Sequence, residues 1–109
     1  MFEKDRQFYR TQIRTGDVAF FQVGAFRMPI REISERSIRY DPASGHAPKL
    51  GEQVKGTVAL ATIGDVDVSG TLTRIHEKSL VLVLDAPGIP HATITALQRF
   101  LMDRHSGRA

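Results

Sequence analysis

The stretch that decides the fold reads Leu80-Val81-Leu82-Val83-Leu84, five apolar residues in succession. A strand that is apolar on both faces is covered on both sides in the folded protein. We therefore expect one face of this strand to line the interior of a barrel and the other face to lie under a helix. A polar turn at residues 76–79 precedes the strand, and Pro87-Gly88-Ile89-Pro90 ends the strand region.

A C-terminal helix is predicted directly after this region, from His91 to His105. Its apolar residues recur at helical spacing, at Ile94, Leu97, Phe100 and Leu101. Pro90 suits the first turn of a helix, and basic residues near the end suit the negative pole of the helix dipole. We assign residues 90–105 to this helix.

Upstream, alternating apolar and polar residues predict further short strands. They cover residues 20–23, 26–31, 38–40, 54–60 and 66–72. About six short strands and one terminal helix indicate an all-β fold with one helix, built as a small antiparallel barrel against which the helix packs. Residues 16–86 would form the barrel, and residues 1–15 an N-terminal arm.

Several local features interrupt the predicted strands. Turns are expected at Gly24-Ala25 and Gly64-Asp65, and a loop rich in Pro, Gly and Ser covers residues 41–51. Pro29 indicates a strand edge or bulge, because proline cannot donate a hydrogen bond to a neighbouring strand. The alternation also breaks before Ile75, which predicts a second bulge or bend.

The composition is that of one ordinary domain. The chain has 109 residues, of which 41% are apolar and 25% are charged. It contains no cysteine, which excludes structural disulfides and thiolate metal sites. No apolar signal segment follows the charged first residues, and no apolar run approaches the roughly 20 residues of a membrane helix. We therefore expect a cytoplasmic chain without membrane insertion.

The positive charge is concentrated in one part of the chain. Residues 1–40 carry eight basic and five acidic side chains, whereas residues 41–109 carry seven of each, so the whole net charge of +3 lies in the first part. Seven of those eight basic residues are arginine, which favours planar, bidentate recognition of anions. The charge is modest for a protein that tracks long nucleic acid. A solvated basic face is the simpler alternative.

Two motifs in this basic part carry candidate binding chemistry. The first is Arg6-Gln7-Phe8-Tyr9-Arg10, whose two guanidinium groups are suited to clamp a phosphate or the edge of a guanine. The second is Glu32-Ile33-Ser34-Glu35-Arg36-Ser37, which supplies the carboxylate and hydroxyl groups that would complete such a site.

These two motifs, in this order and separated by a predicted strand pair, resemble those of the PilZ domain family. That family combines Arg-x-x-x-Arg with a later Asp/Asn-x-Ser-x-x-Gly. Here Glu32 stands at the acidic or amide position and Ser37 at the glycine position. The resemblance covers nearly the whole chain. It implies a six-stranded antiparallel β-barrel with a C-terminal helix, a single PilZ-like domain over residues 1–109, and cyclic di-GMP as the ligand.

The resemblance also implies roles for the motif residues. Arg6 and Arg10 would bind the phosphates or the O6 and N7 atoms of guanine, or stack on a purine face. Glu32 would accept hydrogen bonds from the guanine N1 and N2 groups. The N-terminal arm would fold over the ligand.

Further ligand contacts are expected from the second motif. Ser34 would hydrogen-bond a phosphate or base, and Ser37 would line the floor of the site. Arg31 and Arg36 would add phosphate contacts. The simpler alternatives are that Glu32 pairs with an arginine and that the two serines only satisfy turn hydrogen bonds.

The expected function is a cyclic di-GMP receptor or adaptor that couples the second messenger to a protein partner, with control of motility, biofilm or exopolysaccharide implied by the resemblance. We expect no enzyme activity, since the sequence has no nucleophile elbow, P-loop or dinucleotide fingerprint, and we expect no metal site. One alternative is a degenerate PilZ-like interaction module that binds no nucleotide. Another is a small barrel for single-stranded nucleic acid. A homo-oligomer is left open.

Overall fold

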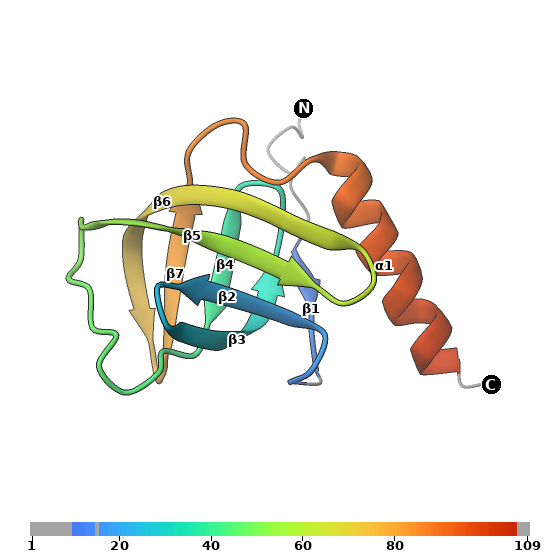
Figure 1. Cartoon of the computed structure of the whole chain (residues 1–109), viewed down its shortest axis with the longest axis horizontal. Coiled ribbons are helices and arrows are strands. Elements are labelled where there is room, and N and C mark those ends of the chain that lie inside the picture. The colour runs from blue at the N-terminus through green and yellow to red at the C-terminus, as the bar shows by residue number, and fades with distance from the viewer. Residues whose placement is uncertain (1–9, 15, 107–109) are drawn as a thin grey trace, which may run out of the picture.

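A computed structural model describes residues 10–14 and 16–106. It contains seven strands and one helix (Figure 1): β1 (Thr11–Gln12), β2 (Ala19–Val23), β3 (Phe26–Ile33), β4 (Ser37–Tyr40), β5 (Gln53–Leu60), β6 (Gly64–His76), β7 (Ser79–Leu84) and α1 (His91–Ser106). The helix begins within one residue of the predicted start and ends one residue after the predicted end. The strand predictions from residue 20 to residue 84 each correspond to an observed strand.

Six of these strands close into a barrel. The antiparallel pairings run β2–β3, β3–β4, β4–β7, β7–β6, β6–β5 and β5–β2, so every barrel strand has two neighbours. This confirms the predicted six-stranded antiparallel barrel. The short strand β1 is added beside β3, where Thr11 lies opposite Ile33 and Gln12 opposite Glu32. The end of the predicted arm is therefore part of the sheet.

The local irregularities agree with the sequence except at one turn. The β3–β4 register shifts between Ile30 and Glu32, just after Pro29, and the β6–β7 register shifts between Leu72 and Arg74. The predicted turn at Gly64-Asp65 was wrong. Gly64 already pairs with Leu60, because the alternation of β6 extends back to this residue and the turn occupies residues 61–63.

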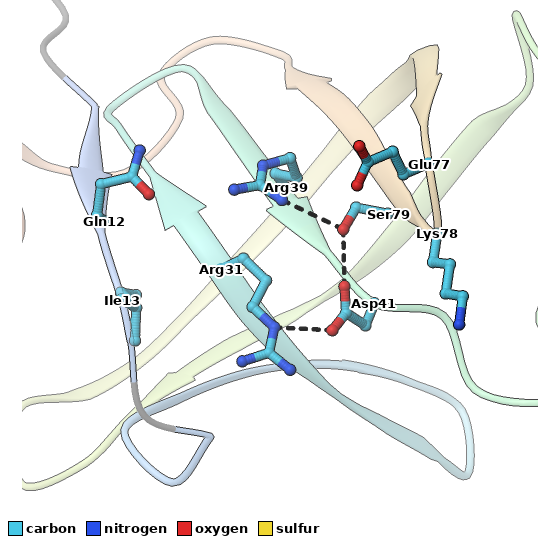
Figure 2. A pocket seen from close by; sticks show the side chains of 8 residues that line it. All are labelled: Gln12, Ile13, Arg31, Arg39, Asp41, Glu77, Lys78 and Ser79. Atoms are coloured by element: carbon cyan, nitrogen blue, oxygen red, sulfur yellow. Dashed lines mark hydrogen bonds and ion pairs between the residues drawn. The ribbon is translucent and has the colours of Figure 1, made fainter.

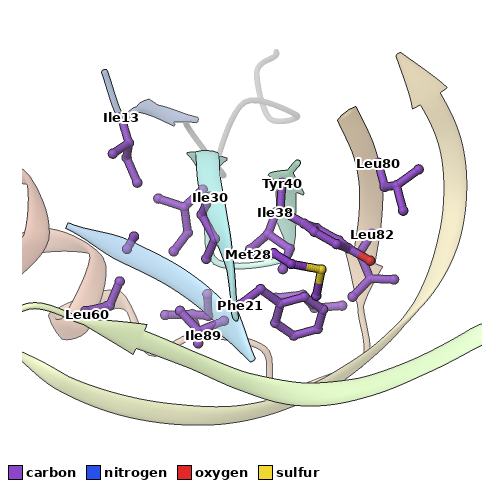
Figure 3. Packing of buried hydrophobic residues seen from close by; sticks show 14 of the residues in the cluster. Ile13, Phe21, Met28, Ile30, Ile38, Tyr40, Leu60, Leu80, Leu82 and Ile89 are labelled. Carbon is purple, nitrogen blue, oxygen red and sulfur yellow. The ribbon is translucent and has the colours of Figure 1, made fainter. Parts of the chain in front are cut away.

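Large apolar side chains fill the barrel interior (Figure 3). Phe21 and Tyr40 pack edge to face with ring centroids 4.9 Å apart, and both are fully buried. Burial of such side chains is the main stabilising contribution to a domain of this size. The Tyr40 hydroxyl hydrogen-bonds His46 Nε2 at 2.8 Å, and burial raises the pKa of Tyr40 to about 12.

The helix does not cover β7, which corrects the expectation for the apolar stretch. Leu80, Leu82 and Leu84 point into the core, but Val83 is 43% exposed. The segment after β7 carries α1 past the barrel, so the helix lies beside the β5–β6 turn and β1 (Figure 1). There it adds Ile94 and Leu97 to the core. A strand that is apolar throughout does not by itself specify which element lies against its outer face.

The length and polarity of the helix also bear on membrane insertion. Among the helices of the described chain, none has the length and apolar character needed to cross a membrane. The cytoplasmic location expected from the sequence stays a prediction.

Candidate functional site

Cross-strand pairing aligns one row of side chains on the outer wall of the barrel. Glu32 of β3 lies opposite Arg39 of β4, Arg39 opposite Val81 of β7, and Val81 opposite Arg74 of β6. On the other side of β3, Gln12 of β1 lies opposite Glu32. Residues from five strands that are distant in the sequence therefore become neighbours on one face.

This row forms part of a hollow of about 200 Å³, which we call the cationic hollow. Its lining residues are Arg10, Glu32, Ser37, Ile38, Arg39, Arg74, His76 and Val81. Among its described lining residues, three arginines face a single carboxylate. The hollow therefore has an excess of positive charge and is suited to an anionic ligand.

Glu32 lies at the centre of the charges in the cationic hollow. Its side chain is only 16% exposed, and its Oε1 lies 3.6 Å from Arg39 Nε and 4.0 Å from Arg10 Nη1. Gln12 donates a hydrogen bond from Nε2 to Glu32 Oε2. The carboxylate proposed to accept from guanine is thus occupied by partners within the chain. One of these is Arg10, the simpler pairing that the sequence left open.

Ser34 and Ser37 hold the turn between β3 and β4, residues 34–37, which we call the β3–β4 turn. Ser34 is 2% exposed, its Oγ lies 3.0 Å from Ser37 Oγ, and it accepts a hydrogen bond of 3.3 Å from the Arg36 backbone N. The Ser34 backbone N donates to the Ser37 carbonyl at 2.9 Å. Turn hydrogen bonds therefore engage both serines, although Ser37 also lines the cationic hollow.

The motif's glycine position needs no glycine here. Positive φ outside glycine occurs in the described residues only at Thr62 and Glu77. Ser37 is the first residue of β4 and has an extended backbone, so it carries no left-handed strain.

The β3–β4 turn is packed against the segment that joins β7 to α1. Arg36 Nε donates to the Leu84 carbonyl at 3.1 Å, and the Ile89 backbone N donates to the Glu35 carbonyl at 2.8 Å. His91 Nδ1 lies 2.7 Å from Glu35 Oε2. At Gly88, a Cβ atom would lie 2.2 Å from the Glu35 carbonyl oxygen, so only glycine permits this close approach. Arg36 therefore supports the turn and does not line the cationic hollow.

The structure brings together some of the residues that the sequence singled out. Arg10, Glu32 and Ser37 share the cationic hollow. Ser34 and Arg36 lie in the adjoining turn. Arg6 lies outside the described residues.

Sequence reasoning missed three further polar residues among those described in the hollow, namely Arg39, Arg74 and His76. The alternation around Arg39 indicates that this side chain points outward. Its proximity to β6 follows only from the order of strands in the barrel, which no local pattern contains.

A second, more open hollow of about 670 Å³ lies on the other side of Arg39 (Figure 2). Arg31 Nε donates to Asp41 Oδ2 at 2.7 Å, and Ser79 Oγ donates to Asp41 Oδ1 at 2.7 Å. Arg39 Nη1 donates to Ser79 Oγ at 3.3 Å. Burial acts to raise the pKa of Asp41, but the hydrogen bonds from Ser79 and Arg31 and the charges of Arg31 and Arg39 outweigh it and lower this pKa below its ordinary value. Arg31 is thus paired within this second hollow.

Comparison with known proteins yields likenesses of fold. No protein-family model and no curated protein matches the sequence. The structure of the K. pneumoniae MrkH–cyclic di-GMP complex matches with a TM-score of 0.61 at 11% identity, over 94% of this chain and 53% of MrkH. The structure of the Bacillus subtilis inhibitor of motility MotI/DgrA matches with a TM-score of 0.58 at 19% identity, over 94% of this chain and 52% of that protein. The chain spans about half the length of either protein. Together with the closed barrel and the terminal helix, these likenesses show that the chain has a PilZ-like fold.

Proposed function

We propose that this chain is a cyclic di-GMP receptor or adaptor domain, which binds the dinucleotide in the cationic hollow and couples its level to a protein partner. The observation that carries the proposal is the meeting of both motifs, through Arg10, Glu32 and Ser37, in one positively charged hollow. The likeness of fold to MrkH, whose structure is a complex with cyclic di-GMP, supports the same ligand class. The proposed role is binding and involves no catalysis.

The chemistry of the ligand matches the groups of the hollow. Cyclic di-GMP carries two negative phosphodiesters and two guanines, and arginine is the commonest partner of guanine O6 and N7. The Arg10 side chain is 64% exposed, and its ion pair with Glu32 is long at 4.0 Å. Arg10 is therefore free to turn toward a phosphate or a guanine at little cost. Arg6 would act from the same motif, four residues earlier in the sequence.

Glu32 would exchange its partners when the ligand binds. In the free protein its oxygens accept from Gln12 and face Arg10 and Arg39. A guanine offers N1 and N2 donors to the carboxylate, and the released arginines gain the phosphates as partners. Ser34 and Arg36 would contribute by holding the β3–β4 turn, because their polar groups already bond within the fold.

Contacts of α1 suggest how binding is passed on. The helix is joined to the β3–β4 turn through His91 and Glu35, and to β1 through a 3.1 Å hydrogen bond from Gln98 Nε2 to Thr11 Oγ1. Both parts of the proposed ligand site therefore contact the same helix. A ligand that draws Arg10 toward the barrel would change these contacts and hence the surface that α1 offers to a protein partner.

Isothermal titration with cyclic di-GMP tests the proposal. We expect saturable binding to the full chain, at least a tenfold loss in Arg10→Ala, and no loss in Arg99→Ala. Arg99 is a matched control because it is an exposed arginine on α1. Absence of binding at high micromolar ligand, with the protein folded, would overturn the proposal.

A second candidate function is a degenerate PilZ-like interaction module that binds no nucleotide. The engaged state of Glu32, which has three partners among the described residues, favours it. The double substitution Glu32→Asp and Ser37→Gly separates the two functions. Binding that arises only in the double variant would support the degenerate module, whereas binding by the natural chain would exclude it.

A further inference from the structure

The end of β6 adds Arg74 and His76 to the cationic hollow. Neither residue belongs to the two motifs. Both are exposed, and they face the hollow from the side opposite β1. Besides the two motifs, the end of β6 therefore supplies hydrogen-bond donors to the hollow. It lies more than thirty residues beyond the second motif.

A β-bulge places Arg74 on this face. Leu72 pairs with Leu82, and both point into the core, so regular alternation would direct Arg74 inward as well. The register instead shifts between Leu72 and Arg74, and Arg74 lies opposite the outward-facing Val81. Bulges commonly redirect a side chain toward a functional surface. Here the bulge keeps a charged residue out of the core and directs it into the hollow.

The guanidinium of Arg74 is available to a ligand. Arg39 is held by Glu32 and Ser79, and Arg10 lies near Glu32. By contrast, the residues that the structure describes give Arg74 no ion-pair partner. An arginine without a carboxylate partner keeps all five of its donors for an anion.

The charge balance of the hollow indicates what kind of anion it fits. Among the described residues that line it, Arg10, Arg39 and Arg74 carry three positive charges, and Glu32 carries one negative charge. This excess of positive charge suits a ligand with two phosphodiester charges. Arg10 and Arg74 enter from the β1 side and the β6 side of the hollow, respectively, so each is placed to meet a different phosphate.

We propose that Arg74, with His76 beside it, is a phosphate-binding residue of the cationic hollow and makes the site prefer a cyclic dinucleotide with two phosphates over a cyclic mononucleotide with one. This inference rests on the proposed function. It makes Arg74, which lies outside both motifs, partly responsible for ligand specificity. It also gives the bulge in β6 a role in binding.

The test measures cyclic di-GMP and cyclic GMP binding by isothermal titration, with Arg74→Ala, Arg74→Lys, His76→Ala and the control Arg99→Ala. We expect Arg74→Ala to weaken cyclic di-GMP binding at least tenfold and to reduce its salt dependence. Arg74→Lys should recover part of the loss, His76→Ala should weaken binding about threefold, and Arg99→Ala should match the natural chain. Cyclic GMP binding should change less than twofold in Arg74→Ala.

Three results would overturn the inference, and they are distinguishable. If the natural chain binds cyclic di-GMP and Arg74→Ala binds it within twofold, the inference alone is wrong. If the folded natural chain binds no cyclic di-GMP, the proposed function fails and the inference fails with it. If Arg74→Ala weakens binding of both nucleotides equally, Arg74 does not distinguish a ligand with two phosphates from a ligand with one.

Discussion

Ser34 and Arg10 come from the two motifs of one candidate site, yet Ser34 is 2% exposed and the Arg10 side chain is 64% exposed. The β3–β4 turn around Ser34 has its own hydrogen bonds and packs against the segment before α1. Among the described residues, the ion-pair partner of Arg10 is Glu32, at the long distance of 4.0 Å. The β3–β4 turn is therefore part of the hydrogen-bonded framework of the fold, whereas Arg10 contributes an exposed positive charge. Substitutions in the turn should reduce stability, and substitutions at the arginine should reduce binding.

The largest effect is expected where the turn meets the segment before α1. Gly88 has a φ of +73°, and a Cβ there would lie 2.2 Å from the Glu35 carbonyl oxygen. Gly88→Ala should therefore lower the free energy of unfolding by about 2–4 kcal/mol, measured by urea denaturation. Gly16→Ala is the control, since a Cβ added there would meet no described residue within 4 Å apart from its chain neighbours. Equal stability of the two variants would show that the turn does not depend on this contact.

Substitution of Arg10, by contrast, should reduce ligand binding and leave stability almost unchanged. Arg10→Ala should change the free energy of unfolding by less than about 0.5 kcal/mol, because an exposed ion pair contributes little. The same variant should weaken cyclic di-GMP binding by about 1.5–3 kcal/mol, the usual contribution of a hydrogen bond to a charged group. Denaturation and titration of the same sample check both values. A large loss of stability in this variant would contradict the comparison.

Ser34→Ala should have an intermediate effect on stability. It removes the acceptor of the Arg36 backbone N–H and the partner of the Ser37 hydroxyl, at a cost of about 1–2 kcal/mol in urea denaturation. The control Ser44→Ala changes an exposed loop serine and should be neutral. If Ser34→Ala stays fully stable and loses the ligand, Ser34 contacts the ligand directly, as the sequence motif implies.

The smallest effect is expected at the contact between the turn and the helix. The His91 side chain is 79% exposed, so loss of its hydrogen bond with Glu35 in His91→Ala should cost about 0–1 kcal/mol of stability. Ligand-induced amide shifts in α1 should nevertheless become smaller, if this contact passes binding to the helix. Unchanged shifts in α1 would show that the contact with β1 is sufficient.

The sequence predicts the framework better than the site. The alternation of apolar and polar residues around Met28, Ile30, Ile38 and Tyr40 predicts strands, because this alternation depends only on neighbouring residues. The place of Arg74 in the hollow depends on two further facts, the position of β6 next to β7 and the bulge before Arg74. The broken alternation near Ile75 signals the bulge, but simple alternation would place Arg74 in the core.

The outer face of β7 illustrates the same limit. The outer face of β7 carries valines, as expected for a strand that is covered on both faces. Val83 is nevertheless 43% exposed, because the chain carries α1 elsewhere. The direction taken by the segment after Leu84 is set by tertiary contacts such as those of Gly88 and Ile89 with Glu35. Local pattern therefore predicts the elements, and long-range contacts decide how they assemble into a site.

Amide chemical-shift mapping during a titration with cyclic di-GMP tests the central claim most directly. The cationic hollow should show the largest shifts, at Glu32, Ser37, Arg39 and Arg74, with smaller shifts in α1. Residues of β2 and β5, on another wall of the barrel, should not respond. Shifts centred on β2 and β5, or no shifts at saturating ligand, would contradict the account.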